Sequence, residues 1–261
     1  NINPYRIFSP AQELTDPKYF AGRVTKIESA LTALCIPGSC LMVFGDRGIG
    51  KTSFVEMIKR IVSGDTTLIY KHGLDKYYNI GDLRHSWISV ECNHDMNNIS
   101  KVLQSLITSP NGIRKFITGR IEREEKSNRG GVSIGKLFGE LFGASYDSES
   151  RLIKEHFSEE NTVELFTNLV MEIDKNLLAE DEGLLIIIDE FDVVEDKSKF
   201  ASLIKTLSKN KVKFLLSGIA ESYEQLISSH NSIQRNLASG RIKIEPMTMQ
   251  EITEFYNLVS A

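Results

Sequence analysis

The chain has 261 residues, of which 41% are apolar and 25% charged, and its formal net charge is −4. This composition is typical of a globular protein, and the acidic balance gives no global reason to expect tight nucleic-acid binding, although a local patch could still provide it. No apolar run approaches the roughly 18 residues that a membrane-spanning helix needs, and no signal peptide is visible.

The three cysteines, Cys35, Cys40 and Cys92, form an odd set without the spacing of a metal site. We therefore expect reduced thiols, as in a cytoplasmic protein. The sequence begins at Asn1 without a methionine and ends just after a predicted helix, which leads us to expect a piece of a longer chain.

A phosphate-binding loop is the strongest pattern in the first part of the chain. Residues 24–34 have the apolar spacing of a helix, and the apolar run at 40–44 predicts a buried strand. This strand leads directly into GDRGIGKT at 45–52, which fits the pattern G-x-x-x-x-G-K-[ST] between a strand and a helix. In such a loop, backbone N–H groups at a helix N-terminus face phosphate oxygens, and glycines allow the close approach.

The loop supplies the candidate nucleotide-binding residues. We expect Lys51 to reach the terminal phosphates and the Thr52 hydroxyl to bind Mg²⁺. The complete predicted set is Gly45, Asp46, Arg47, Gly48, Ile49, Gly50, Lys51, Thr52 and Ser53. The helix predicted over 53–62 has one apolar face, and Gly64 is placed to end it in a left-handed conformation.

The rest of the chain alternates predicted strands and helices. Further strands are expected at 67–70, 87–91, 184–188 and 212–216, and helices near 99–107, 163–178 and 220–229. This alternation predicts an α/β fold, a three-layer sandwich with a mostly parallel five-stranded sheet covered by helices on both faces.

Two carboxylates follow the apolar strand at 184–188. Open parallel sheets bind ligands at the carboxyl ends of their strands, where Asp189 and Glu190 lie. We expect Asp189 to organise Mg²⁺ and its waters, and Glu190 to take a proton from an attacking water. The alternative is a strand that simply ends in solvated acids. Asp192 is interpreted as surface charge only.

Ser217 ends the strand at 212–216, where its hydroxyl could touch a γ-phosphate or orient the water. A hydroxyl that only satisfies a turn is the alternative interpretation. The lysines at 205, 209, 211 and 213 are interpreted as a solvated face rather than a phosphate track.

The order of these parts resembles the AAA+ P-loop ATPases, closest to the branch that holds replication initiators and STAND-type signalling ATPases. Tyr19-Phe20-Ala21-Gly22-Arg23 is similar to the F-x-G-R box of that family, and the phosphate loop and the Asp189-Glu190 pair follow in the family's order. The resemblance implies that ATP is the nucleotide, that Phe20 and Gly22 line the adenine site, and that Ser217 is the sensor-1 residue.

The resemblance also implies a homo-oligomer. The family carries an arginine finger at the end of the core, which completes the nucleotide site of a neighbouring subunit. Arg235 is the candidate for this role and Arg241 the alternative, while a surface or lid-contacting arginine is the competing interpretation.

The expected organisation is an AAA+ core at 1–247 with an insertion at about 111–158, followed at 248–261 by the first helix of a lid whose remainder is absent. Lys51 and Asp189 are 138 positions apart, which is longer than usual in this family. Within the insertion we expect an amphipathic helix at 113–126 and a hairpin or partner-binding ridge at 132–142. The insertion is interpreted as a solvated edge or as a site for DNA, a subunit or another domain.

Three functions compete at this stage. The first is a Mg²⁺-dependent ATPase module of AAA+/STAND type, part of a regulatory or antiviral defence protein with further domains or partners beyond residue 261. The second is a scaffold that holds ATP or ADP without hydrolysis, and the third is a small-molecule phosphotransferase. Glu190 favours the first, because a scaffold needs no general base there. A DNA-directed initiator or transposition-type ATPase is the alternative biological setting.

Overall fold

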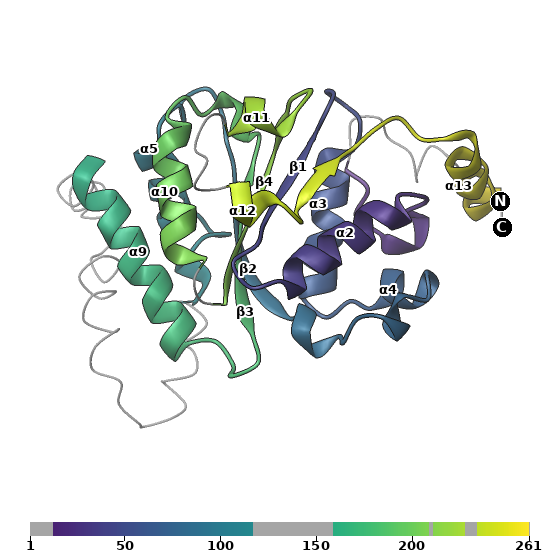
Figure 1. Cartoon of the computed structure of the whole chain (residues 1–261), viewed down its shortest axis with the longest axis horizontal. Coiled ribbons are helices and arrows are strands. Elements are labelled where there is room, and N and C mark those ends of the chain that lie inside the picture. The colour runs from purple at the N-terminus through teal and green to yellow at the C-terminus, as the bar shows by residue number, and fades with distance from the viewer. Residues whose placement is uncertain (1–12, 117–158, 209–210, 228–233, 261) are drawn as a thin grey trace.

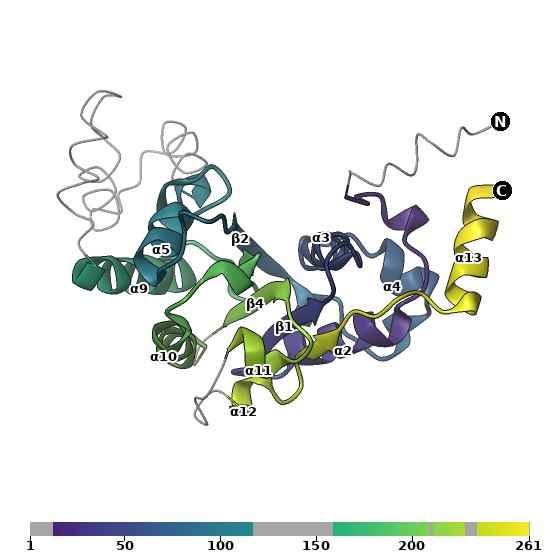
Figure 2. The same cartoon turned by 90° about the horizontal axis from the view of Figure 1, so that it is seen from above.

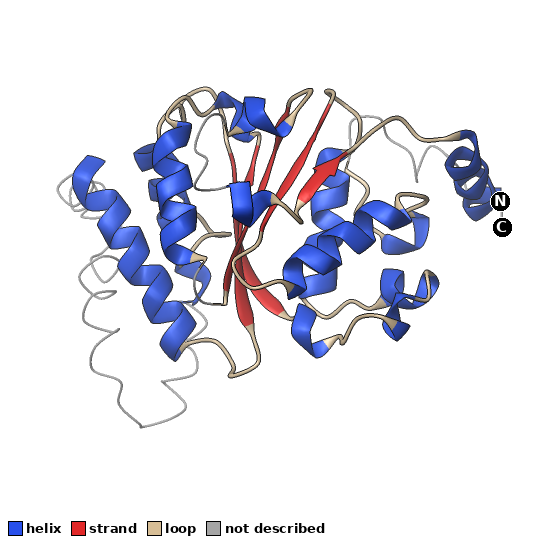
Figure 3. Cartoon of the chain, in the orientation of Figure 1, coloured by secondary structure: helices blue, strands red, loops and turns tan. Residues whose placement is uncertain are grey.

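A computed structural model describes residues 13–116, 159–208, 211–227 and 234–260. Within these residues a five-stranded sheet crosses the molecule, and helices cover both faces (Figure 1, Figure 3). The strands are β1 (Cys40–Gly45), β2 (His85–Glu91), β3 (Gly183–Asp189), β4 (Val212–Ile219) and β5 (Arg241–Lys243). Each strand is parallel to its neighbours, in the order β2-β3-β4-β1-β5.

The helices form two outer layers, which Figure 2 shows on either side of the sheet. One layer holds α2 (Val24–Cys35), α3 (Lys51–Val62) and α4 (Thr67–Lys71), and the other holds α5 (Ile99–Thr108), α9 (Glu159–Asn176) and α10 (Lys197–Leu207). Short elements connect them: η1 (Pro17–Tyr19), η2 (Leu74–Lys76), η3 (Gly81–Leu83), η4 (Phe191–Val193), α11 (Tyr223–Leu226) and α12 (Gln234–Leu237). The chain then continues from β5 to α13 (Met249–Ser260), which lies away from the sheet (Figure 1).

The sheet separates two apolar clusters because successive side chains along a strand point to opposite faces. In β3, Leu185 and Ile187 pack on the α3 side, whereas Ile186 and Ile188 pack on the α5 side. All seven residues of β3 are buried, as the continuous apolar run predicts. The same alternation places Asp189, two residues after Ile187, on the α3 side of the sheet.

The predicted α/β three-layer fold is confirmed, but one strand prediction is wrong. Residues 67–70 lie in helix α4, and the fifth strand is instead β5, which pairs with β1. The backbone N–H of Thr67 donates to Asp65 Oδ1 at the start of this helix, while Leu68 and Ile69 are buried. A short apolar run suits either conformation, and here the local cap and the packing favour the helix.

Two further expectations need correction. The helix expected at 220–229 is described only as α11, because Ser222 and Ile227 have extended or irregular backbones. The lysine series does not form one solvated face: Lys205 and Lys211 are exposed, but Lys213 is buried in β4 and its ammonium donates to the backbone oxygen of Ile36. Lys209 lies outside the described residues.

The start of the expected insertion packs on the core. Asn111 accepts a hydrogen bond from the backbone N–H of Ser89 in β2, and Ile113 is fully buried. The remainder of the insertion, residues 117–158, lies outside the described residues, so the helix and hairpin expected there stay predictions. The helix expected at 248–258 is present as α13.

All three cysteines are free; Cys40 and Cys92 are buried, whereas Cys35 is exposed. Among the described helices, none combines the length and the apolar character needed to cross a membrane.

Candidate functional site

The phosphate loop connects the end of β1 to the start of α3, as the sequence predicts. Gly45, Gly48 and Gly50 all have positive φ, at 151°, 73° and 92°. A Cβ atom on Gly45 would collide with the backbone oxygen of Ile244, so glycine is required there by space as well as by conformation. The loop therefore brings its main chain to the N-terminal end of α3, where the helix dipole favours an anion.

Lys51 folds back over this loop. Its ammonium donates to the backbone oxygen of Asp46 at 2.8 Å and to that of Gly45 at 3.2 Å, and the residue is only 6% exposed. In the first part of the loop, Asp46, Arg47 and Gly48 are exposed. An anion held by the loop amides would meet the positive charge of Lys51 directly.

The end of β3 carries the two predicted acids in different environments. Asp189 is buried, and its Oδ1 accepts a hydrogen bond from the backbone N–H of Glu190 at 2.9 Å. Glu190 is half-buried and has a left-handed backbone, with φ 53° and ψ 37°. Such a conformation costs a non-glycine residue about 1–3 kcal/mol, and strained residues of this kind concentrate at functional sites.

The pKa of Glu190 is raised above its usual value, first by burial and then by the negative charges of Asp192, Asp189 and Glu91, while Lys51 opposes the shift. A carboxylate with a raised pKa is a stronger base, which suits proton abstraction from water.

Asp192 is more than surface charge, contrary to the sequence interpretation. Its Oδ1 accepts a hydrogen bond from the backbone N–H of Ile219 at 2.8 Å. This contact joins η4, the turn that follows Glu190, to the end of β4. Asp192 therefore fixes the turn that carries the candidate base.

Ser217 lies between the two halves of the site, because β4 separates β1 from β3. It is opposite Val43 of β1 and shares the α3 side of the sheet with Leu215. Its side chain is fully buried, and its Oγ has no hydrogen-bond partner among the described residues. Other buried hydroxyls of the chain, such as that of Ser208, are also unpartnered, but Ser217 lies near the carboxyl end of β4, between the loop and the two acids, where its hydroxyl is available to a ligand or water.

The remaining predicted binding residues lie in varied surroundings. Phe20 is 3% exposed and packs in the core, with its ring centroid 6.5 Å from that of Phe54. Gly22 is buried and its backbone N–H donates to Glu254, whereas the Ser53 hydroxyl accepts from the backbone N–H of Leu14 at 3.1 Å. The base contacts of Phe20 and Gly22 stay predictions, as does phosphate binding by each residue of 45–53.

The two candidate finger arginines are both exposed. Arg235 lies in α12, and Arg241 opens β5 with its guanidinium 3.8 Å from the ring centroid of Tyr223. Both positions are open to solvent in the single chain, and the finger role stays a prediction for either residue.

Arg23 is a residue of the site that the sequence interpretation left without a role. Its guanidinium donates to the backbone oxygens of Ile49 at 2.5 Å and Gly50 at 3.2 Å. The arginine of the F-x-G-R box was the available signal, but no sequence pattern shows which backbone groups it contacts.

The donor set suits Mg²⁺. Thr52 offers a hydroxyl and Asp189 a carboxylate, the oxygen donors that this ion prefers, and Mg²⁺ sites at nucleotides commonly add only one or two protein ligands to phosphate and water. Among the described residues, no group of three or more histidine, cysteine or acidic side chains is arranged to hold a metal ion.

No family model matches the sequence, and no curated protein matches it. Among solved structures, the ORC1 protein of Aeropyrum pernix in complex with DNA is similar with a TM-score of 0.49 and 10% identity over 94% of this chain. A Walker-type ATPase of Pyrococcus abyssi is similar with a TM-score of 0.45 and 13% identity over 95% of this chain. The chain spans 50% and 60% of the lengths of these two structures.

Proposed function

We propose that this chain is a Mg²⁺-dependent ATPase module of AAA+ type. The observation that supports this most strongly is that the Lys51 loop follows β1 and the strained Glu190 follows β3, at the carboxyl ends of these parallel strands. The unpartnered Ser217 hydroxyl lies on β4, between them. Neither a structural glycine turn nor a strand ending in solvated acids accounts for all three features together.

Each residue would contribute a separate part of the reaction. The loop amides and Lys51 would bind the β- and γ-phosphates, and Thr52 and Asp189 would hold Mg²⁺, which when bound neutralises charge on the phosphate oxygens. Glu190 would accept the proton of the attacking water, and the Ser217 hydroxyl would orient that water or contact the γ-phosphate.

The left-handed Glu190 favours hydrolysis over a scaffold role. A protein that only holds nucleotide gains nothing from a strained carboxylate whose pKa is raised beside the phosphate site. Within this proposal, the module belongs to a larger regulatory or defence protein of STAND type and assembles so that Arg235 reaches the nucleotide of a neighbouring subunit. The exposure of Arg235 is compatible with this role.

The test compares binding and turnover in three variants. Lys51→Ala should weaken binding of a fluorescent ATP analogue about 100-fold, since it removes the cation from the phosphates. Glu190→Gln should keep binding while phosphate release falls about 10²–10⁴-fold. Lys59→Ala, which changes another lysine of α3 whose ion pair is with Glu56, should match the wild type in both assays.

Two results would argue against the proposal. Unchanged nucleotide binding by Lys51→Ala would remove the phosphate site. Equal, negligible phosphate release by the wild type and Glu190→Gln, together with tight binding, would support the scaffold instead.

A further inference from the structure

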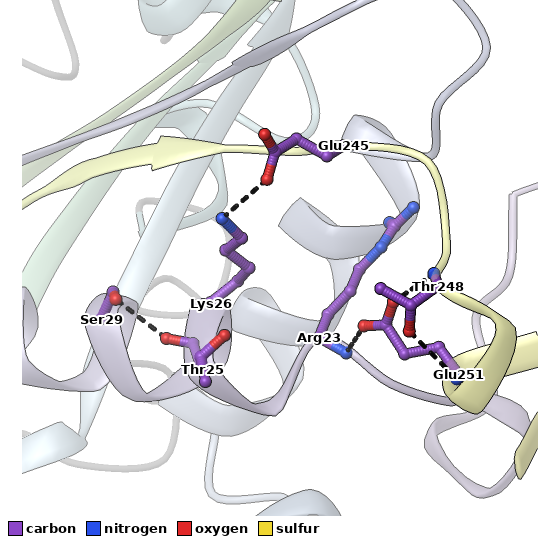
Figure 4. Close-up of polar contacts among 7 residues, drawn as sticks. All are labelled: Arg23, Thr25, Lys26, Ser29, Glu245, Thr248 and Glu251. Atoms are coloured by element: carbon purple, nitrogen blue, oxygen red, sulfur yellow. Dashed lines mark hydrogen bonds and ion pairs between the residues drawn. The ribbon is translucent and has the colours of Figure 1, made fainter.

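Arg23 connects the N-terminal turn to the phosphate loop. It lies at the start of α2 with a left-handed backbone, φ 56°, and its side chain extends towards the loop (Figure 4). Its two terminal nitrogens donate to the carbonyl oxygens of Ile49 and Gly50, the residues immediately before Lys51. A Cβ atom added to Gly50 would lie 2.9 Å from Arg23 Nη1, so guanidinium and loop are in close contact.

These carbonyls matter because the two sides of a peptide unit point in opposite directions. When the loop N–H groups face an anion, the carbonyls of the same peptides must find donors on the other side. A guanidinium has a rigid, planar fork of donors and can hold two neighbouring carbonyls at once. Arg23 thus fixes the orientation of the peptide groups that follow Ile49 and Gly50.

The backbone of Arg23 is held in turn by α13. Its N–H donates to Glu251 Oε1 at 2.7 Å, and the N–H of Gly22 donates to Glu254 Oε2 at 3.1 Å. The N–H groups of Gly22 and Arg23 are consecutive donors at the start of α2, where the helix dipole favours negative charge. Each of them donates to one carboxylate of α13.

Glu251 is well suited to anchor the helix. Its second oxygen accepts from the backbone N–H of Thr248 at 2.8 Å, and the Thr248 hydroxyl accepts from the N–H of Glu251 (Figure 4). Although burial alone would raise its pKa, hydrogen bonds from Thr248 and Arg23 keep the pKa of Glu251 below its usual value. The carboxylate is therefore ionised at neutral pH, at the positive end of α2.

We propose that Arg23 is a positioning residue for the phosphate loop and that Glu251 couples the docking of α13 to the shape of that loop. The consequence for nucleotide affinity rests on the ATPase function proposed above. The consequence for the loop itself does not, because it concerns the protein without nucleotide.

Hydrogen–deuterium exchange of the loop segment 45–52 in nucleotide-free protein tests the first part. Arg23→Ala should increase exchange there about tenfold, since two charge-assisted hydrogen bonds are lost. Arg23→Lys should restore protection only partly, because an ammonium lacks the planar fork. Loop exchange at the wild-type rate in a folded Arg23→Ala protein would overturn the positioning role, and full protection in Arg23→Lys would overturn the need for a planar fork.

The second part is tested by Glu251→Ala, alone and combined with Arg23→Ala. Glu251→Ala should increase exchange in 45–52 by a smaller factor, and the double variant should exchange no faster there than Arg23→Ala alone. The matched control is Lys26→Ala, which breaks a 3.4 Å ion pair between α2 and Glu245, in the segment that leads from β5 to α13, and should leave loop exchange unchanged. Wild-type exchange in Glu251→Ala, or additive effects in the double variant, would overturn the coupling.

Nucleotide affinity is the separate readout. Arg23→Ala should weaken binding of the fluorescent ATP analogue about tenfold, and Lys26→Ala should not. If the wild type binds no nucleotide, the ATPase proposal fails, but the exchange data still decide whether Arg23 shapes the loop.

Discussion

The Asp192 carboxylate accepts a hydrogen bond from the backbone N–H of Ile219 at 2.8 Å, which ties the turn after Glu190 to the end of β4. The approach is close: a Cβ atom on Gly218 would lie 2.8 Å from Asp192 Oδ1. After burial, the negative charge of Asp192 is the largest cause of the raised pKa of Glu190.

Replacing that charge should move the pH profile of hydrolysis. Glu190 acts as a base only when ionised, so its raised pKa shifts the acidic limb of the kcat profile to higher pH. Asp192→Asn keeps an oxygen acceptor for Ile219 but removes the charge, and should move the limb to lower pH. Asp196→Asn, a surface carboxylate nearby in sequence, is the control, and an unmoved limb in Asp192→Asn would contradict the electrostatic explanation.

Glu190→Gly should stabilise the protein while abolishing turnover. Glycine adopts the left-handed conformation without strain, and we expect a gain of about 1 kcal/mol in the free energy of unfolding, or roughly 2–4 °C in Tm. Because the folded-state pKa of Glu190 is raised, its ionised form destabilises the fold as pH rises through that pKa. The gain should therefore be larger at pH 7 than at pH 4. Thermal melting measures it; Glu190→Ala, which keeps the backbone strain, should gain less.

Ser217→Ala should leave stability nearly unchanged but slow hydrolysis about tenfold. The hydroxyl makes no hydrogen bond to the described residues, so its removal leaves no protein group unpaired. Ser208→Ala is the matched control, because its buried Oγ is likewise unpartnered but it follows α10, before β4 begins and away from the carboxyl end of that strand. Chemical denaturation measures stability and phosphate release measures turnover. Equal turnover in Ser217→Ala and wild type would show that this hydroxyl has no role in hydrolysis.

Alanine at two loop glycines should have unequal effects. Gly45→Ala places a methyl group against the Ile244 carbonyl and should cost more than 2 kcal/mol of stability and most nucleotide binding. At Gly48 a Cβ would meet no atom within 4 Å, so only the strain of φ 73° remains, at about 1 kcal/mol. Melting curves and nucleotide titrations compare the two, and similar costs would show that space at Gly45 does not matter.

Much of the fold is predictable because it depends on long, regular patterns. The apolar spacing of α2, α3 and α5 indicates a helix with one buried face, and the β-branched-rich run of β3, followed directly by Asp189 and Glu190, favours a buried strand. The strand prediction for residues 67–70 is wrong because four residues are too few to establish an apolar period. The hydrogen bond from Thr67 to Asp65 favours a helix there instead. β5 is equally hard to find, since Ile242 is its single buried residue and the backbone of β1 supplies its partners.

Some residues of the candidate site can likewise be predicted from sequence, and others cannot. The phosphate loop and the Asp189-Glu190 pair are visible in sequence because their residues are adjacent along the chain. Arg23 and Asp192 are not, since their partners lie 26 and 27 positions away and are backbone groups, which every residue possesses. Residue identity alone cannot indicate such contacts.

The short strand β5 has a consequence for how copies of this protein can associate. It forms one margin of the sheet, and its two outer positions, Arg241 and Lys243, are exposed cations on either side of buried Ile242. A second molecule that tried to extend the sheet here would bring its own pair of cations against these, and cationic margins of this kind discourage aggregation. Productive self-assembly should therefore not extend the sheet at β5, and variants that neutralise both cations should form fibrils or amorphous precipitate more readily.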